Sequence, residues 1–409
     1  TGLMNYKKLV PKDSFIGQYM QYMSVVETAE AYDFWCALWA IGVGCGRSVY
    51  VDRPNSPVFL NWYLILAAEA GVTRKSTAIS SIRDIVRGHG PILTGRTSPE
   101  SLEILLHEST REGRGARANF AVSELVTVLG KEGYLSGMPG LLTDLYDCHK
   151  ERRSPGTLKS GEIIQKDVYV TFLSASTPSW LVTAINPSVI EGGFTSRVIF
   201  VVSDERKRAI AWPEARRDDA DKVIRQSYIQ LLQNAKDIGN ITISKGGLSK
   251  FTKWYNNRRV HNDPFLSSFE AREDDHVLRL AACLCINDGI LEIQTKHITT
   301  AIKVVDSVKT GANRLFGGDF SANARLIGAI ARVRELLLEA GTDGISQTKL
   351  QRRVARRLDA KELRMLMNIM HECGMVQIFK YKRAEMYRAT QAIEKLGVTS
   401  EVLARLNLQ

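Results

Sequence analysis

The region from residue 47 to residue 215 alternates short apolar runs with stretches of helical spacing, and few folds accommodate that alternation. The clearest apolar runs are Tyr63–Ala68, Ala118–Val122, Val168–Ser174 and Val198–Val202. Each run has the length of a buried strand. Strands that alternate with helices assemble into a parallel sheet whose two faces are covered by helices. The sequence therefore predicts an α/β fold built on a parallel sheet.

The chain has 409 residues, which is too long for a single core and predicts several domains. Changes in pattern divide it into an N-terminal helical segment, the α/β core, a mostly helical region, a C-terminal domain and a helical tail: 1–54, 55–215, 216–318, 320–390 and 391–409. In the C-terminal domain, helices are predicted over Ser321–Ala340, Ser346–Leu358 and Asp359–Cys373, followed by a hairpin. Three helices and a hairpin in this order are typical of a winged helix-turn-helix.

Composition limits the classes of partner. The net charge of +11 and the pI near 9.3 favour a polyanionic partner, of which nucleic acid is the usual one; the alternative is a merely soluble basic protein. None of the six cysteines forms a CxxC pair, so the sequence offers no typical zinc site and fits a reducing cytoplasm. No apolar run has the length needed to cross a bilayer.

The stretch YLILAAEAGVTRKSTAISSI, residues 63–82, resembles a phosphate-binding loop. An apolar strand, a loop with Gly71, and a helix beginning near Lys75, Ser76 and Thr77 follow one another, so backbone N–H groups and a helix N-terminus would face an anion. In the strict pattern GxxxxGK[ST], however, Glu69 and Arg74 stand at the two glycine positions. The alternative is an ordinary strand-to-helix turn with a surface lysine.

Two later strands also end in polar side chains. Glu124, after Ser123, ends the strand in RANFAVSELVTVLG and could polarise an attacking water beside a phosphate loop. Thr177 ends the strand in DVYVTFLSASTPSWL and could orient water or contact a γ-phosphate. The alternatives are structural: Ser123 and Thr177 could cap the helices that follow, and Glu124 could be a charge near a helix N-terminus.

In order along the chain, LILAAEAGVTRKST, FAVSEL, FLSASTP and GGFTSRVIFVVSD resemble the ATPase domain encoded by phages and mobile elements. More distantly, they are similar to the AAA+ core of minichromosome-maintenance helicases. The resemblance covers roughly residues 13–300. It implies an AAA+-like P-loop ATPase core with a helical lid at 216–318, ATP and Mg²⁺ as cofactors, and a homo-oligomer, by analogy a hexamer, in the cytoplasm of a bacterial host.

The resemblance also implies roles for single residues. Lys75 would be the phosphate lysine, Ser76 the magnesium hydroxyl, Thr77 the start of the helix, Glu124 the catalytic glutamate that also assists the metal site, and Thr177 the first sensor, with Gly71 and Arg74 in the loop. Arg197 matches an arginine finger, which acts on a neighbouring subunit's nucleotide. Arg272 is the candidate for a second sensor. The alternatives are a salt bridge at the sheet edge for Arg197 and a solvated helix position for Arg272.

Two basic regions are candidates for DNA contact. In the helicases that the chain resembles, a hairpin before the sensor strand reaches into the ring pore, and here that segment carries Lys150, Arg152, Arg153, Lys159 and Lys166. The winged helix carries Arg356, Arg357, Lys361, Arg364 and Lys382, while Met365, Leu366, Ile369 and Met370 are predicted to be mostly core. Contacts to the DNA backbone are therefore expected over base reading. The alternatives are a solvated loop and a protein-interaction module.

Three functions remain open at this point. The first is an ATP-dependent DNA helicase or translocase of a phage or mobile element that works as a ring in DNA replication. The second is an initiator or loader whose assembly on DNA is controlled by ATP. The third is a non-catalytic DNA-binding scaffold, for which Glu69, Arg74 and Ser123 argue.

Overall fold

The computed structural model describes residues 4–69, 71, 73–130, 137–154, 162–185, 193–203, 209–212, 219–237, 239–258, 261, 264–316, 329–330, 332–354, 358, 360–382 and 384–394. The chain divides into two compact units, Thr1–Leu315 and Phe316–Gln409. The first carries both the α/β core and the helical region that follows it. The second carries the three predicted helices and the hairpin.

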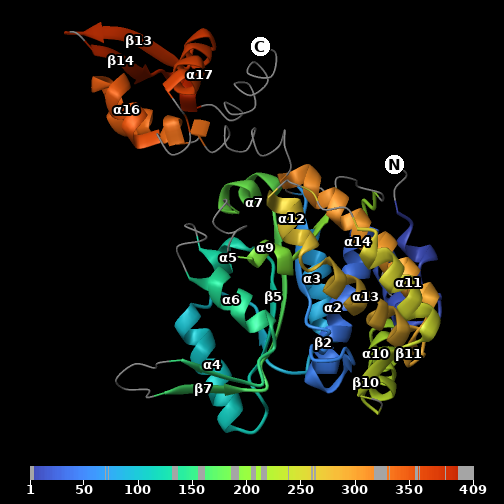
Figure 1. Cartoon of the computed structure of the whole chain (residues 1–409). Helices are drawn as coiled ribbons and strands as arrows, with labels where there is room; N and C mark the ends of the chain where they lie inside the picture. Colours follow the sequence, from blue (N-terminus) through green and yellow to red (C-terminus); the bar gives the residue numbers. More distant parts are fainter. Residues whose placement is uncertain are drawn as a thin grey trace. The chain divides into compact units, whose positions relative to one another are not determined.

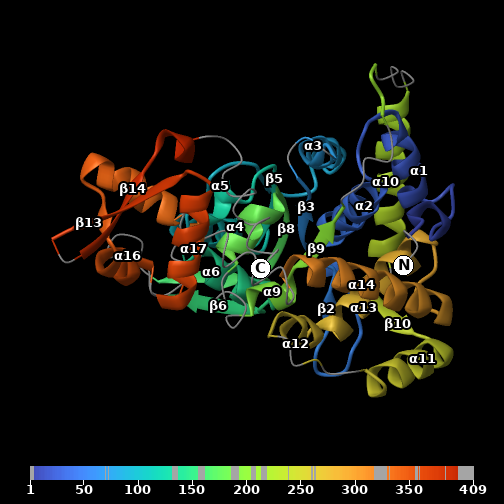
Figure 2. The same ribbon diagram turned by 90° about the horizontal axis from the view of Figure 1, so that it is seen from above.

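A five-stranded parallel sheet forms the centre of the first unit, with the strand order β4-β5-β8-β3-β9. The strands are β3 (Tyr63–Ala67), β4 (Ile92–Leu93), β5 (Arg117–Val122), β8 (Tyr169–Ser176) and β9 (Ile199–Val202). Figure 2 shows β5, β8, β3 and β9 side by side in this order. The predicted α/β fold with a parallel sheet is therefore confirmed. The short edge strand β4 was not predicted.

The connections leave β3 and β8 in opposite directions. After β3 the chain runs through α3 (Lys75–Ile85) to β4 at one edge, whereas after β8 it runs through α7 (Pro178–Ala184) and α9 (Phe194–Arg197) to β9, beyond β3. Right-handed crossovers then place α3 and the later helices on opposite faces of the sheet. The carboxyl ends of β3 and β8 thus form a switch point, where open α/β sheets bind ligands.

Helices cover both faces of this sheet (Figure 1). Helix α2 (Glu30–Cys45) packs with α3 on one face, and α4 (Pro99–Arg111) and α6 (Met138–Tyr146) pack on the other. Helix α2 is buried along nearly its whole length, because it lies between the sheet and α10 (Ala220–Lys236). The first 45 residues are therefore part of the main core.

The helix predicted over residues 13–46 is in fact two helices, α1 (Phe15–Tyr22) and α2. A 3₁₀ turn, η2 (Met23–Val25), and extended residues separate them. The β-branched side chains of Val25, Val26 and Thr28 lose rotamer freedom in a helix, which accounts for the break. The interruption places Glu27 next to the loop after β3.

The region 216–318 is mostly helical, as predicted, with α10, α11 (Lys245–Asn256), α12 (Pro264–Glu270), α13 (Glu273–Asn287) and α14 (Thr295–Phe316). Two short strands were not predicted there, β10 (Asn240–Ile243) and β11 (Glu292–Ile293). They join β1 (Tyr50–Val51) and β2 (Val58–Phe59) in a second sheet of order β11-β10-β1-β2. This sheet and the packing of α13 on α2 join the helical region to the N-terminal segment.

The predicted hairpin before β8 is present as β6 (Glu151–Ser154) and β7 (Ile163–Lys166), which pair antiparallel and pack on α4. Its tip, with Lys159, lies outside the described residues.

The second unit begins, in its described part, with helical residues 329–330 and 332–340. Then come β12 (Ile345–Ser346), α16 (Gln347–Val354), α17 (Ala360–Glu372), β13 (Val376–Tyr381) and β14 (Ala384–Ala389), with the strand order β12-β14-β13. On α17, Leu366, Ile369 and Met370 are buried, but Met365 is 39% exposed, so its prediction as core is wrong. Met365 lies on the outer face of the helix, next to Arg364. No helix in the described ranges is long and apolar enough to span a membrane.

Gly42 of α2 offers a test of this packing. A Cβ there would lie 2.2 Å from the carbonyl oxygen of Leu60, a backbone atom that cannot rotate away. We expect Gly42→Ala to lower the free energy of unfolding by about 1–3 kcal/mol, measured by urea denaturation. The matched control is Gly140→Ala on α6, where a Cβ meets nothing within 4 Å and which should be neutral or stabilising by up to about 1 kcal/mol. Equal effects of the two changes would contradict close packing of α2.

Candidate functional site

The loop after β3 has the backbone of an anion site although it lacks one glycine. Gly71 has φ of 78° and Arg74 has φ of 47°, so both lie in the left-handed region. Helix α3 begins at Lys75 directly after Arg74, and no side chain caps its N-terminus, unlike α1, α4, α7 and α11, which have Ser or Thr caps. Its first N–H groups are therefore open to a ligand, and the helix dipole favours an anion there.

Lys75 points back into this loop. Its Nζ donates to the carbonyl oxygens of Ala68, at 2.6 Å, and Glu69, at 3.1 Å. Partial burial lowers the pKa of Lys75, an effect that the charge of Glu69 opposes. Glu69 itself is exposed, as a phosphate site beside it requires. The ammonium group therefore stands inside the curve of the loop, where it would meet a phosphate.

Helix α2 holds the loop at both ends through one hydroxyl group. Tyr32 Oη donates to the carbonyl oxygen of Ala67, at 2.9 Å, and accepts from Thr73 Oγ1, at 3.3 Å. Tyr32 and Thr73 are buried. The start and the end of the loop are thus tied to the same helix.

Arg74 keeps the left-handed conformation where glycine is the usual residue. For a residue with a Cβ this conformation costs about 1–2 kcal/mol. Nε and one terminal nitrogen of its guanidinium each lie 3.1 Å from Oε2 of Glu27, whose side chain is 7% exposed. The other oxygen of Glu27 accepts from the backbone N–H of Ile210, at 2.8 Å. Glu27 thus offsets the strain at Arg74 and joins the loop to the residues after β9.

Glu124 and Thr177 follow the two strands next to β3 in the sheet order β5-β8-β3. Ser176 pairs with Ala67, so Thr177 stands beside the start of the loop, and the N–H of Leu125 donates to Ala175 at 2.8 Å. Glu124 is exposed, and the described part of the chain gives its carboxylate no hydrogen bond or ion pair. The structure thus brings Lys75, Ser76, Glu124 and Thr177 to one edge of the sheet.

Thr177 also has the structural role that was its alternative. Its side chain caps α7 by accepting from the N–H of Trp180, at 3.4 Å. Its role as a sensor stays a prediction. Ser123, by contrast, caps no helix: the short α5 (Val126–Leu129) has no side-chain cap.

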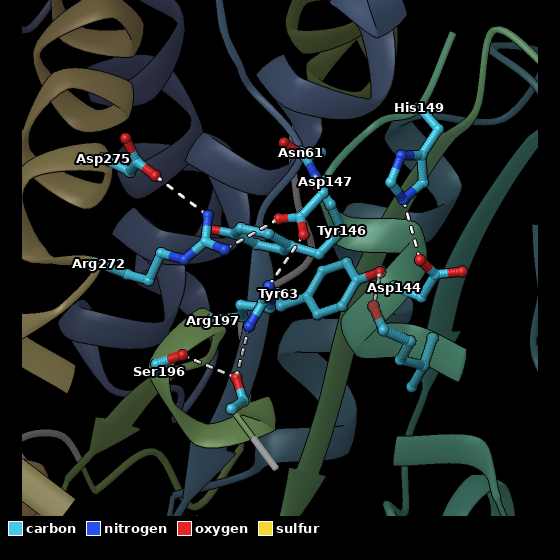
Figure 3. A network of polar contacts seen from close by, with 12 residues as sticks. Asn61, Tyr63, Asp144, Tyr146, Asp147, His149, Ser196, Arg197, Arg272 and Asp275 are labelled. Carbon is cyan, nitrogen blue, oxygen red and sulfur yellow. Dashed lines mark hydrogen bonds and ion pairs between the residues drawn. The ribbon is translucent and has the colours of Figure 1, made fainter. Parts of the chain in front are cut away.

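Arg197 and Arg272 lie at the other end of the sheet, and one carboxylate binds both (Figure 3). A terminal nitrogen of Arg197 lies 2.9 Å from Oδ2 of Asp147, and one of Arg272 lies 3.3 Å from Oδ1. Arg272 also lies 3.5 Å from Asp275. These intrachain ion pairs match the alternative given for Arg197, and they show that Arg272 is more than a solvated position. Roles on a nucleotide stay predictions for both.

His276 fixes α9, which carries Arg197, to α13. Its Nε2 lies 2.9 Å from the carbonyl oxygen of Ser196, and its ring stacks on Phe269 and Trp62. Full burial, and then the nearby charge of Arg279, lowers the pKa of His276 to about 3, so the ring is neutral at physiological pH. A neutral ring donates to Ser196 through Nε2, which sets its tautomer.

The described basic residues of the hairpin all have acidic neighbours. Lys150 lies 2.6 Å from Asp167, Arg153 lies 2.7 Å from Glu151, and Lys166 lies 3.9 Å from Glu151. These three side chains remain more than half exposed. Arg152 differs: its side chain is 17% exposed and bonded to Glu103, Asp144 and Gln165. Its predicted role in DNA contact is therefore wrong, because its guanidinium is used to fasten the hairpin to α4 and α6.

In the second unit, Lys361 and Arg364 are exposed on α17, and Lys382 lies at the β13–β14 turn with φ of 55°. Arg356 and Arg357 lie outside the described residues. DNA contact by this unit stays a prediction. The described residues contain no group of three or more His, Cys, Asp or Glu side chains that could hold a metal ion.

Sequence patterns missed Tyr32, Glu27, Asp147 and His276. Each acts through a contact with a segment that is remote in sequence, such as Asp221 for Tyr22 or Arg74 for Glu27. A buried helix that is apolar all round, with single polar groups, gives no indication of which distant atom each group meets. The break in the helix before Glu30 was a usable signal for Glu27.

No protein-family model matches the sequence, and no curated protein matches it. Among solved structures, the chain is similar to the full-length MCM homolog from Methanopyrus kandleri, with 13% sequence identity and a TM-score of 0.45. The match covers 76% of this chain and 63% of that one, so the chain spans less than two thirds of that protein's length. So distant a likeness assigns no function, and the argument for one rests on the geometry described above.

Arg74 allows a direct test of the loop's conformation. Arg74→Ala loses the ion pair with Glu27 and keeps the left-handed strain, whereas Arg74→Gly loses the same pair and removes the strain. We expect the glycine variant to be more stable than the alanine variant by about 1 kcal/mol, measured by urea denaturation. If the two variants unfold alike, Arg74 does not have the left-handed conformation in solution.

Proposed function

We propose that this protein is an ATP hydrolase that acts on DNA as a homo-oligomer, as a helicase or translocase. One observation carries the proposal: a loop with an uncapped helix N-terminus and an inward-facing lysine lies beside an unpaired glutamate and a strand-end threonine at a switch point of a parallel sheet. This arrangement suits a nucleoside triphosphate. The resemblance of the motifs adds the context, DNA replication of a phage or mobile element in the host cytoplasm.

The residues present fit ATP and Mg²⁺. The open N–H groups of α3 and the ammonium of Lys75 would bind the β- and γ-phosphates. The hydroxyl of Ser76 is exposed in the first turn of α3, and Glu124 has a free carboxylate, so both could supply the oxygen ligands that Mg²⁺ prefers. When bound, the ion neutralises charge on the phosphoryl oxygens. Glu124 would then orient and deprotonate the attacking water.

Arg197 and Arg272 support an oligomer because they cannot complete this chain's own site. Leu64 pairs with Ile199, so Arg197 stands at the amino end of β3, whereas the loop follows its carboxyl end. The strand between them spans five residues, about 16 Å at roughly 3.3 Å per residue. On this proposal both arginines leave Asp147 to neutralise the phosphates of a neighbouring copy.

A second candidate is an initiator or loader that assembles on DNA under ATP control without processive unwinding. The charge balance at the base of the hairpin favours it, because Lys150, Arg153 and Lys166 already have carboxylate partners. A strand-displacement assay separates the two candidates. ATP hydrolysis with DNA-stimulated turnover and unwinding supports the helicase, whereas nucleotide-dependent assembly without unwinding supports the loader.

Nucleotide binding is tested by two substitutions. Lys75→Ala removes a charged donor worth about 1.5–3 kcal/mol, so ATP should bind roughly ten- to a hundredfold more weakly. Glu124→Gln should bind ATP normally and lose about 10²–10⁴-fold in hydrolysis rate. Binding is measured with a fluorescent ATP analogue and hydrolysis by phosphate release. Lys222→Ala, at an exposed position on α10, is the control. Normal hydrolysis by Lys75→Ala would exclude this loop as the site.

The shared site is tested by mixing two inactive variants, Arg197→Ala and Glu124→Gln. At a head-to-tail interface, one quarter of the sites in an equal mixture combine an intact Glu124 with an intact Arg197. We therefore expect recovery of up to about a quarter of the wild-type ATPase rate. Exchange of subunits is verified by mass spectrometry of the mixture. No recovery in mixtures that do exchange would show that Arg197 acts within its own chain.

A further inference from the structure

A groove between α11 and α14 has a charge pattern that the ATPase proposal does not use. Its cavity of about 570 Å³ is lined by both helices. Lys250 and Lys253 line it from α11 and Lys303 from α14, and all three are exposed. Within the described residues these lysines have no ion pair.

The acidic groups of the groove are already neutralised. Lys309 lies 2.8 Å from Glu273 and 3.7 Å from Glu270, and Glu270 also lies 2.5 Å from His261. Asp306 is the remaining acid of the lining, and it lies 3.9 Å from Lys309. The positive charge of Lys250, Lys253 and Lys303 is therefore left for a ligand from outside.

Flat side chains accompany these charges. Arg258 lines the groove with its guanidinium 4.0 Å from the ring of Tyr255 and 5.3 Å from that of Trp254. Tyr255 is 43% exposed, and Trp254 lines the groove. Lysines that follow a backbone, together with rings on which bases stack, are the combination found in sites for single-stranded nucleic acid. An acidic peptide would use the lysines but not the rings.

We propose that the α11–α14 groove binds single-stranded DNA. Lys250, Lys253 and Lys303 bind consecutive phosphates, and the Arg258–Tyr255 pair with Trp254 provides the stacking surface. Helix α11 has 12 residues, about 18 Å at 1.5 Å per residue, which suits a short segment of a few nucleotides. The groove lies on the helical region, apart from the hairpin and from the second unit's basic residues.

The test is binding of fluorescein-labelled decathymidylate without nucleotide, followed by fluorescence anisotropy over a range of salt. The variant is Lys250→Ala with Lys253→Ala and Lys303→Ala; the matched control is Lys8→Ala with Lys12→Ala and Lys222→Ala, which removes three exposed lysines elsewhere. Each lost phosphate contact on a single strand reduces the salt slope by about 0.7. The groove variant should therefore lose about 2 from the slope and about 100-fold in affinity near 0.1 M salt, while the control changes less than twofold.

A second pair of variants tests the stacking surface. Tyr255→Phe keeps the ring under Arg258 and should bind decathymidylate as the wild type does, whereas Tyr255→Ala should bind about tenfold more weakly. Equal affinity and slope for the two lysine sets would overturn the proposal. So would displacement of the oligonucleotide by polyglutamate of equal charge as efficiently as by unlabelled decathymidylate, which would indicate an acidic protein partner. Because the assay contains no ATP, its outcome is independent of the ATPase proposal.

Discussion

The parallel pairing of β3 with β8 on one side and β9 on the other is the constraint on which the rest of the first unit depends. Because the chain leaves β3 toward one edge and leaves β8 toward the other, the two connections diverge and leave their strand ends open. The same pairing fixes Thr177 beside the loop, Glu124 one strand further, and Arg197 at the opposite end. Helix α2 packs on β3 and β8 and holds the loop through Tyr32. The site is thus a consequence of strand order.

Sequence patterns predicted the strands that are apolar along their length, because a strand buried on both faces leaves a run with few alternatives. They missed β10 and β1, which pair across about 190 residues and are too short to have a pattern of their own. They placed the loop, the glutamate and the threonine at strand ends, which the topology brings together. The partners of Arg197 and Arg272 were not predictable, because Asp147 lies in a turn whose position depends on the packing of α6 against α9.

Arg74 shows how a departure from a motif can preserve its geometry. The glycine of the strict pattern supplies a left-handed backbone conformation, and here an arginine has the same conformation while paired to a buried carboxylate. Arg74 by itself is therefore weak support for a scaffold that has lost its nucleotide. Whether the loop binds ATP depends on what it presents, and it presents uncapped N–H groups and Lys75. The departure also connects the loop through Glu27 to the residues after β9, which an ordinary glycine could not do.

The distribution of charge in the first unit separates two kinds of basic surface. At the base of the hairpin, lysines and arginines face carboxylates, so their charge mainly holds the ribbon on α4 and α6. In the α11–α14 groove the carboxylates are buried and satisfied by Lys309 and His261, so the outer lysines remain free. A net charge of +11 does not show where a polyanion binds; the pairing of each acid does. By that criterion the helical region, more than the described part of the hairpin, is where the first unit would hold a nucleic-acid strand.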